Sequence, residues 1–356
     1  MSQLLPRNNH SLKLAAGDWV VVRSKEEILA TLDARGRLDG LPFQPEMLAF
    51  CGRRLRVFKV AHKTCDTIHK TGGRRMRDAV HLEDVRCDGS AHGGCQADCL
   101  LFWKTAWLRR PDDNASTEQA AAGSVRGAEE TLKRSVCESA DSPDPVWICQ
   151  ATKLFEATEP LKWWDLRQYV QDVTTGNHSA WHMIRLLLAS GYRDLVHLGV
   201  GYRFLVALYN GVQRLRGGLP FPVSDGPIDI GQPTPQGTLD LRPGDWVEVK
   251  TAEEIRGTLN HRGFNRGMRF DAEMLLFCGG RFRVHQRVER IINEQTGRML
   301  PMKNPCIQLE GVYCRAECSE MRLGCPRAIK SYWREIWLRR VDERESRTGP
   351  DTGRHL

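Results

Sequence analysis

Gly17-Asp18-Trp19-Val20 returns 227 positions later as Gly244-Asp245-Trp246-Val247, and this repeat predicts two similar folding units in the chain. From Gly17 to Val57 the first copy aligns without a gap on the second, and 23 of the 41 residue pairs are identical. Each copy closes on a matching tetrapeptide, Trp107-Leu108-Arg109-Arg110 or Trp337-Leu338-Arg339-Arg340. The chain is therefore a divergent tandem duplication.

Both copies contain the same succession of predicted elements. A short apolar strand at Asp18–Arg23 leads into a helix, for which Ser24 and Glu27 form a capping box that Thr251 and Glu254 repeat. A short helical turn follows, and then come two strands per copy, Arg54–Val60 and Ala79–Arg86 in the first and Arg281–Val288 and Cys306–Tyr313 in the second. This order predicts a small, strongly bent antiparallel sheet in each copy.

The expected fold class is α+β, with two repeated, mostly antiparallel small β-barrels carrying short inserted helices, and a central helical region. The Gly-Asp-Trp-Val start of each copy resembles the first strand of SH3-like small barrels in bacterial proteins, which implies a partly open SH3-like barrel. The expected parts are repeat domain 1 (1–112), a flexible linker (113–145), a helical region (146–218), a Pro/Gly linker (219–240), repeat domain 2 (241–345) and a tail (346–356). Within the first linker, a transient helix is expected around Ala128–Arg134.

Length and composition set the wider limits. At 356 residues the chain exceeds the size of one hydrophobic core, so two or three domains are expected. The net charge of +8 permits an anionic ligand, a protein partner or nucleic acid. Met1–Leu14 has no apolar core of signal-peptide length, so we expect a cytoplasmic protein. In that compartment the twelve cysteines are expected to be metal ligands or buried thiols rather than disulfides.

The central region is expected to be helical at Asp165–Val173 and Ala180–Leu215. The apolar stretch 183–210 is interrupted by arginines, so we expect no transmembrane span. Two interpretations remain open for it: helices that cover the barrels, or a helix that lies on a membrane surface as a peripheral contact.

Cysteines gather just before the closing tetrapeptide of each copy, and in the first copy histidines lie among them. Thiolate and imidazole are the ligands that zinc prefers, so the clusters predict a zinc site, although neither has the paired Cys-x-x-Cys spacing of zinc ribbons. An iron–sulfur cluster and thiols without metal are the alternatives. The candidate metal ligands are Cys65, His69, Cys87, His92, Cys95, Cys99, Cys306, Cys314, Cys318 and Cys325.

The duplication narrows this choice. Alignment pairs Cys87 with Cys314 and Cys95 with Cys325, so an ancestral site using these positions, completed differently in each copy, is the simplest hypothesis. The remaining candidates have no matching ligand in the other copy. Cys51 and its partner Cys278 follow an aromatic residue in an apolar turn, which is typical of core cysteines.

Chemistry beyond metal binding is less defined. The hairpin Lys63–Arg77 gathers Lys, Thr, Gly and Arg, a composition suited to holding an anion, but it lacks the P-loop order. No Rossmann fingerprint, nucleophile elbow or kinase motif is present in the sequence.

Two classes of function remain. The first is a metal-stabilised tandem-barrel protein that binds an anionic or macromolecular partner. Nucleic acid is one version, with Trp19, Trp246 and the arginines from Arg281 to Arg290 as its footprint. The matching strand positions of the two tryptophans nevertheless favour the core. The second is a metalloenzyme with an open metal site in copy one, for which Asp66, His69, Asp88 and His92 are the candidate acid–base groups.

Taken together, Gly-Asp-Trp-Val, Phe-Cys-Gly, the Cys87–Cys95 loop and Tyr332–Arg340 resemble a bacterial family that is sometimes encoded near biosynthetic genes. The resemblance covers both copies and most of the helical region. It implies an accessory or catalytic role in small-molecule biosynthesis, and it implies no established activity and no catalytic residue.

Overall fold

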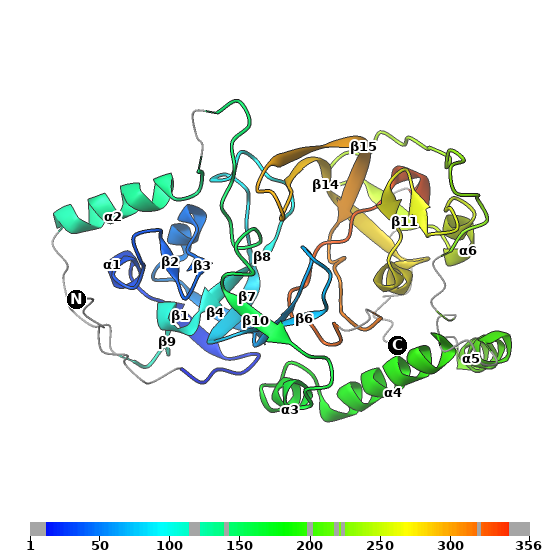
Figure 1. Ribbon diagram of the computed structural model, residues 1–356, viewed down its shortest axis with the longest axis horizontal. Helices are drawn as coiled ribbons and strands as arrows, with labels where there is room; N and C mark the ends of the chain where they lie inside the picture. The colour runs from blue at the N-terminus through cyan, green and yellow to red at the C-terminus, as the bar shows by residue number, and fades with distance from the viewer. Residues whose placement is uncertain are drawn as a thin grey trace. The chain divides into compact units, whose positions relative to one another are not determined.

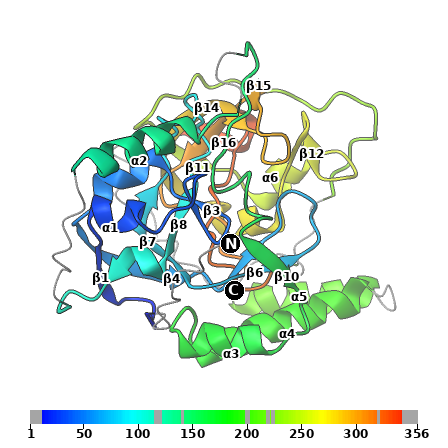
Figure 2. The same ribbon diagram turned by 60° about the vertical axis from the view of Figure 1, so that its left-hand side comes forward.

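The computed structural model describes residues 12–113, 122–138, 142–197, 202–216, 221, 225–318 and 322–341. It confirms the α+β class, with two curled antiparallel half-barrel sheets and a central helical region (Figures 1 and 2). The described residues divide into two compact units. Unit 1 takes Met1–Gly93, Leu100–Ser179 and Asn293–Arg298, and unit 2 takes Gly94–Cys99, Ala180–Ile292 and Met299–Leu356.

The sheet of unit 1 is built from the first copy of the repeat. Its strand order is β8-β7-β4-β1-β9, and every neighbouring pair is antiparallel. The strands are β1 (Trp19–Val22), β4 (Arg54–Val60), β7 (Ala79–Arg86), β8 (Leu100–Lys104) and β9 (Leu108–Arg109). The predicted bounds of β4 and β7 are confirmed.

The sheet of unit 2 repeats this arrangement in the order β15-β14-β11-β16. Its strands are β11 (Trp246–Val249), β14 (Arg281–Ile292), β15 (Met299–Leu309) and β16 (Leu338–Arg340). β14 and β15 form a longer hairpin than expected, since β15 begins before Cys306 and ends before Tyr313. Within the described residues, two isolated bridges, Ile307–Trp333 and Tyr313–Lys330, stand where β7 pairs with β8 in unit 1.

The shorter elements follow the repeat as well. In unit 1 they are α1 (Lys25–Leu29), β2 (Arg37–Leu38), β3 (Leu41–Pro42), η1 (Pro45–Phe50), β5 (Lys63–Cys65), β6 (Gly73–Met76) and η2 (Thr105–Trp107). In unit 2 they are α6 (Ala252–Arg256), β12 (Phe264–Asn265), β13 (Met268–Arg269), η3 (Ala272–Phe277) and η4 (Glu335–Trp337). Both predicted capping boxes are present at the starts of α1 and α6.

The repeated Gly-Asp pair shapes the entry to each sheet. Gly17 and Gly244 adopt φ of 91° and 92°, a region that favours glycine, and each donates its N–H to a β-strand carbonyl at 2.8 Å. The aspartate that follows accepts a hydrogen bond from the backbone three residues earlier, at 2.9 Å in both units. The repeated motif is therefore a turn that starts the first strand.

Matching aromatic clusters fill the two cores. Trp107 packs edge-on against Phe43 with ring centroids 5.0 Å apart, and its indole N–H donates to Thr31 Oγ1 at 3.0 Å. In unit 2, Trp337 packs against Phe270 at 5.4 Å and donates to Thr258 at 2.9 Å. All three residues occupy equivalent positions of the repeat, so duplication preserved the packing and its hydrogen bond together.

Trp19 and Trp246 were expected in the core, and the structure corrects this. The side chain of Trp19 is 50% exposed, and that of Trp246 is half-buried. An arginine lies over each ring: Arg54 is 4.9 Å from the centroid of Trp19 and Arg283 is 5.9 Å from that of Trp246. In both strands Val20 or Val247 is the residue that points into the core, because successive side chains alternate.

Helices and a strand occupy the segments between the two copies. Unit 1 contains α2 (Ala122–Arg134), β10 (Thr158–Leu161) and α3 (Arg167–Thr174), and unit 2 contains α4 (Ala180–His197) and α5 (Tyr202–Arg216). The expected linker 113–145 thus includes a helix, and Leu132 of α2 is buried in the core of unit 1. Residues 114–121 and 139–141 of that segment lie outside the described residues.

The helices of the central region were expected at 165–173 and 180–215. The described part agrees with helices in both places, except that 198–201 lie outside it. Among the described residues, none of the helices combines the length and the apolar character that a bilayer span requires.

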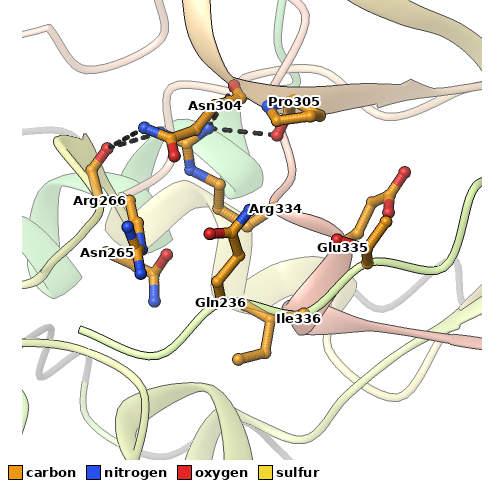
Figure 3. A pocket seen from close by; sticks show the side chains of 10 residues that line it. Gln236, Asn265, Arg266, Asn304, Pro305, Arg334, Glu335 and Ile336 are labelled. Carbon is orange, nitrogen blue, oxygen red and sulfur yellow. Dashed lines mark hydrogen bonds between the residues drawn. The ribbon is translucent and has the colours of Figure 1, made fainter. Parts of the chain in front are cut away.

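A small pocket lies on unit 2 between η4 and the strands β12 and β15 (Figure 3). Its cavity volume is about 20 Å³, enough for one small chemical group. Ten residues line it: Gln236, Gly237, Thr238, Asn265, Arg266, Asn304, Pro305, Arg334, Glu335 and Ile336.

Candidate metal centre

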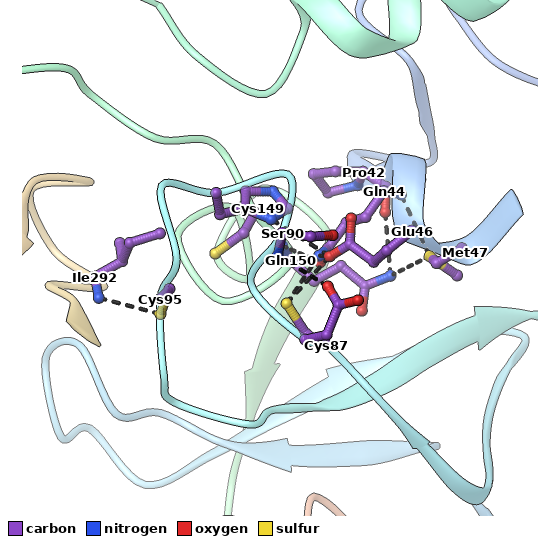
Figure 4. Close-up of polar contacts among 12 residues, drawn as sticks. Pro42, Gln44, Glu46, Met47, Cys87, Ser90, Cys95, Cys149, Gln150 and Ile292 are labelled. Carbon is purple, nitrogen blue, oxygen red and sulfur yellow. Dashed lines mark hydrogen bonds and ion pairs between the residues drawn. The ribbon is translucent and has the colours of Figure 1, made fainter. Parts of the chain in front are cut away.

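Three side chains of unit 1 meet in a buried group that could hold a metal ion. They are Glu46, Cys87 and His92, each offering one ligand atom, and these atoms all lie within 4.8 Å of one another. In the part of the chain that the structure describes, no other three residues of the types His, Cys, Asp or Glu meet this criterion. Figure 4 shows Glu46 and Cys87 side by side, with Gln44 and Gln150 next to them.

Each ligand comes from a different local structure. Glu46 lies in the first turn of η1, which Pro45 begins. Cys87 directly follows the last residue of β7, so the sheet fixes its position. His92 sits in the turn after it, where its backbone N–H donates to the carbonyl of Gly89 at 2.9 Å. A strand end, a turn and a 3₁₀ helix of one unit thus converge on one point.

The polar contacts within the group centre on one oxygen of Glu46. Its Oε1 accepts from the Cys87 thiol at 3.1 Å and from the Gln44 amide at 2.5 Å, and lies 3.4 Å from Nδ1 of His92. Burial raises the pKa of the Glu46 carboxyl, but its interactions with His92 and Cys87 outweigh burial and lower that pKa below its usual value. The carboxylate is therefore ionised at neutral pH.

The orientation of His92 is that of a metal-binding imidazole. Nε2 lies 3.1 Å from the carbonyl oxygen of Ile148, to which it can only donate, and the ring is fully buried. In the neutral ring the proton on Nε2 leaves a lone pair on Nδ1, which faces the group. Histidine ligands of metals commonly hold their second ring nitrogen by such a bond to a backbone carbonyl.

Two atoms of the group are buried and lack a hydrogen-bond partner among the described residues: Glu46 Oε2 and His92 Nδ1. Nδ1 and the carboxylate both carry lone pairs, so their approach inside the protein is unfavourable on its own. A positive charge between them, either a proton on Nδ1 or a metal ion, removes this repulsion. The carboxylate, thiolate and imidazole together supply two negative charges, which match a divalent cation.

Glu46 was not among the residues predicted from the sequence, because it lies far in the chain from the clusters of Cys and His that indicate the metal site. The signal was nevertheless present, since Glu46 and Glu273 are one of the identical pairs of the repeat. Glu273 is also buried, and its Oε1 accepts the backbone N–H of Cys318 at 2.6 Å. In both units this glutamate therefore contacts the cysteine-bearing loop.

The other candidates of the first hairpin have different surroundings. Cys65 is the last residue of β5 and is buried. The ring of His69 packs edge-on against Phe155 with centroids 4.7 Å apart. Asp66 accepts hydrogen bonds from the backbone of Ile68, His69 and Thr71 at 2.9 Å each. The structure thus assigns Asp66 to holding its own loop.

Cys95 and Cys99 belong to a segment that is part of unit 2. The thiol of Cys95 accepts from the backbone N–H of Ile292 at 3.3 Å (Figure 4). Next to it, Gln96 hydrogen-bonds through its backbone and its side chain to β14, including Arg290 O at 3.1 Å. The structure therefore places Cys87 and Cys95 in separate units, and their shared role in one site stays a prediction.

The four cysteines predicted as ligands in the second copy are distributed over β15 and the loop that follows it. Cys306 is buried in β15, where burial raises its thiol pKa to about 11. Burial also raises the pKa of Cys318, as does its neighbour Glu273. The backbone N–H groups of Cys314 and Cys325 donate to Ile329 and Arg322. No disulfide joins any of the chain's twelve cysteines, all of which are described.

Cys51 and Cys278 pack against the two cores, as the sequence predicted. Burial raises the thiol pKa of Cys51 to about 11 and that of Cys278 to about 12. Both thiols are therefore protonated at neutral pH and unsuited to binding a metal without a large cost.

Cations of the hairpin Lys63–Arg77, which the sequence offered as an anion site, are engaged by unit 1. Lys63 pairs with Asp172 at 2.5 Å, and Arg74 donates to the carbonyl of Thr158 at 2.6 Å. Arg75 pairs with Asp165 and Arg77 with Glu159. These contacts give the hairpin a structural role.

The chain matches no protein-family model, no curated protein and no solved structure. Its function is therefore inferred from its own residues.

Proposed function

We propose that this protein is a zinc-binding tandem small-barrel protein, in which Glu46, Cys87 and His92 hold the ion. The observation that carries the proposal is the meeting of a carboxylate, a thiol and an imidazole whose ligand atoms lie within 4.8 Å of one another. Two of their atoms, Glu46 Oε2 and His92 Nδ1, are buried and have no hydrogen-bond partner among the described residues. Zinc takes oxygen, sulfur and nitrogen ligands of these three kinds and tolerates their combination in one site.

Zinc at this position would supply folding free energy to unit 1. It would link η1 to the end of β7 and the turn that follows it, both of which lie far from η1 in the sequence. Because such a site is absent from the unfolded chain, the free energy of metal binding adds to the stability of the fold. This accounts for a cysteine-rich loop on a small barrel.

Three protein ligands leave a fourth position of a tetrahedral ion for another group, and this favours the metalloenzyme alternative. Burial argues against it, since only 5% of the Glu46 side chain and 1% of the His92 side chain are exposed, which restricts access for a substrate. Asp66 and His69, expected as acid–base groups, are engaged elsewhere in unit 1. We therefore favour the structural role. An iron–sulfur cluster has less support. Only one of the three ligands in this group is a cysteine, whereas iron–sulfur clusters are held mainly by several cysteine thiolates.

We extend this proposal to a binding role for the barrels. Their partner would be an anionic ligand or a macromolecule of small-molecule biosynthesis. It is supported by the net charge of +8 and by the arginine-covered, half-exposed Trp19 on the surface of unit 1. Exposed aromatic rings beside arginines are a common feature of binding surfaces.

The proposal predicts the metal content of single variants. Protein purified without added chelator should contain zinc. Each of the variants Cys87→Ser, His92→Gln and Glu46→Gln should contain one zinc ion per chain less than the wild type. Loss of a ligand should also lower the melting temperature, because the metal stabilises the fold. Elemental analysis and a thermal melt on the same samples measure both effects.

Cys137→Ser is the matched control, since Cys137 is another half-buried thiol of unit 1 and lies outside the group. It should leave the zinc content unchanged. Zinc that stays at the wild-type level in all three ligand variants would contradict the proposal. Iron with a broad visible absorption would replace it by the iron–sulfur alternative.

A further inference from the structure

Arg334 is a buried cation that has no carboxylate partner among the described residues. Its side chain lines the pocket of unit 2, and 7% of the residue is exposed. The guanidinium donates to three backbone carbonyls, those of Asn304 at 2.7 Å, Pro305 at 3.2 Å and Arg266 at 2.8 Å (Figure 3). Its Nε is buried and has no hydrogen-bond partner among the described residues.

The second charge of the pocket is also positive. Arg266 lines it, and its Nε donates to the carbonyl of Thr234 at 3.2 Å. Glu335 lines the pocket too, but its carboxylate is taken up by Arg287 at 2.6 Å and by the backbone N–H of Leu239 at 2.6 Å. Burial lowers the pKa of Arg334, and the neighbouring Arg266 lowers it further, against an opposing effect of Cys306.

The first copy of the repeat shows how the same position is neutralised. Lys104 follows Trp103 as Arg334 follows Trp333, and Asp39 aligns with Arg266 at the constant offset of 227. Lys104 is buried, and its ammonium donates to Asp39 Oδ2 at 3.1 Å. Asp39 and Arg266 share the same left-handed backbone, with φ of 49° and 47°. Unit 1 therefore pairs its buried cation with a carboxylate of its own chain, and unit 2 has an arginine in place of that carboxylate.

We propose that the pocket of unit 2 binds the anionic group of a small ligand, a carboxylate or a phosphate, in the role that Asp39 has in unit 1. A buried guanidinium is costly unless a negative charge compensates it, and arginine forks match carboxylate and phosphate oxygens. The cavity of about 20 Å³ admits one such group, so the rest of the ligand stays outside it. This site lies in unit 2, shares no residue with the metal group of unit 1, and goes beyond the zinc proposal.

The repeat itself supplies the decisive variant. Arg266→Asp gives unit 2 the carboxylate that unit 1 has, at a backbone conformation that aspartate tolerates. Isothermal titration of the full chain with sodium phosphate and with sodium acetate, each against sodium chloride of equal ionic strength, measures binding. The wild type should bind at least one of the two anions saturably, and Arg266→Asp should bind it more weakly by about tenfold or more.

Thermal melts of the same proteins provide a second readout. Without added anion, Arg266→Asp should melt at a higher temperature than the wild type, because it pairs Arg334 within the chain. Arg269→Asp is the matched control: it makes the same change of charge at an exposed residue of β13 and should keep wild-type binding.

Saturation by phosphate alone identifies a phosphate-bearing ligand, and saturation by acetate identifies a carboxylate. Absence of saturable binding of either anion by the wild type would overturn the proposal, as would equal binding by Arg266→Asp. The zinc content of each sample is measured in parallel. Since Arg266 lies outside the metal group, a failed anion site with normal zinc content leaves the zinc proposal standing, and the reverse holds as well.

Discussion

At the scale of single residues, Asp66 shows how a candidate catalytic group turns out to be structural. Both carboxylate oxygens are used: Oδ1 accepts from the backbone of Ile68 and His69, and Oδ2 accepts from the N–H of Thr71 at 2.9 Å and its hydroxyl at 2.5 Å. Burial opposes the charge, yet these hydrogen bonds lower the pKa of Asp66 to about 2. The ionised side chain therefore holds the turn between β5 and β6.

The lowered pKa predicts how stability depends on pH. The unfolded aspartate has a pKa of about 4, so the stabilisation by Asp66 is complete above pH 4 and is lost as the pH falls toward 2. Asp66→Asn places an amide donor where the carboxylate accepted two bonds from Thr71, and should cost about 1–3 kcal/mol at pH 7. Urea unfolding at pH 7 and pH 3 should show the difference between the two proteins shrinking at the lower pH.

Asp88→Asn is the control for this experiment, because Asp88 is exposed and its carboxylate accepts one backbone hydrogen bond, from Ser90. It should change the free energy of unfolding by less than about 0.5 kcal/mol. Equal stability of Asp66→Asn and the wild type at pH 7 would show that the turn holds without the carboxylate.

Among the elements, α3 depends on a buried ion pair for its position in unit 1. Asp172 of α3 is fully buried and contacts two residues that precede or start β5: Lys63 at 2.5 Å and His62 at 3.3 Å. After the helix, the side-chain amide of Asn177 bonds to both the N–H and the carbonyl of Val60 at 2.8 Å, as a neighbouring strand would. These contacts fix α3 beside the end of β4.

Removing Asp172 should therefore be costly. Asp172→Ala leaves the ammonium of Lys63 buried without its carboxylate, and breaking one side of a buried pair costs about 3–5 kcal/mol. The double variant Asp172→Ala/Lys63→Met should recover part of this loss, because it removes the charge that Asp172 compensates in the wild type. Chemical unfolding of both variants measures the difference.

Glu159→Ala provides the comparison for an exposed ion pair, since Glu159 and Arg77 are both more than half exposed. Its cost should stay below about 1 kcal/mol. A similar cost for Asp172→Ala would mean that Lys63 finds water or another acceptor when the aspartate is absent.

The apolar pattern of α4 does not show which of its faces is buried. Met183, Leu186 and Val196 are buried, but Trp181 and Leu188 on the opposite face are each 69% exposed. Both faces are apolar, so the sequence could not tell which one packs within unit 2. The choice is made by tertiary contacts, such as the hydrogen bond from Tyr192 of α4 to the carbonyl of Leu205 in α5.

For the whole molecule, the duplication made the fold predictable. The repeat identified both sheets, both capped helices and the closing strands, because local patterns and turn glycines recur at matching positions of the two copies. The aromatic cores could be paired in the same way. The linker was predicted less well, since the small, polar composition of 122–134 gave little sign that α2 would bury Leu132 in the core.

The candidate site could be predicted in part. Cys87 and His92 were named from the sequence, and the structure brings them together with Glu46, which was missed. Cysteine spacing carries no information about a carboxylate forty residues away in another turn. The alignment shows that Arg266 replaces Asp39 in the second copy. Only the structure shows that each of these residues contacts a buried cation, Lys104 or Arg334.

If one carboxylate, one thiolate and one imidazole of unit 1 bind zinc, X-ray absorption at the zinc edge should detect these three ligands. The difference between wild type and Cys87→Ser should contain one sulfur at about 2.3 Å and lighter ligand atoms at about 2.0–2.2 Å. Identical zinc spectra and zinc content in the two proteins would contradict the claim, as would a lost site made of four sulfur ligands.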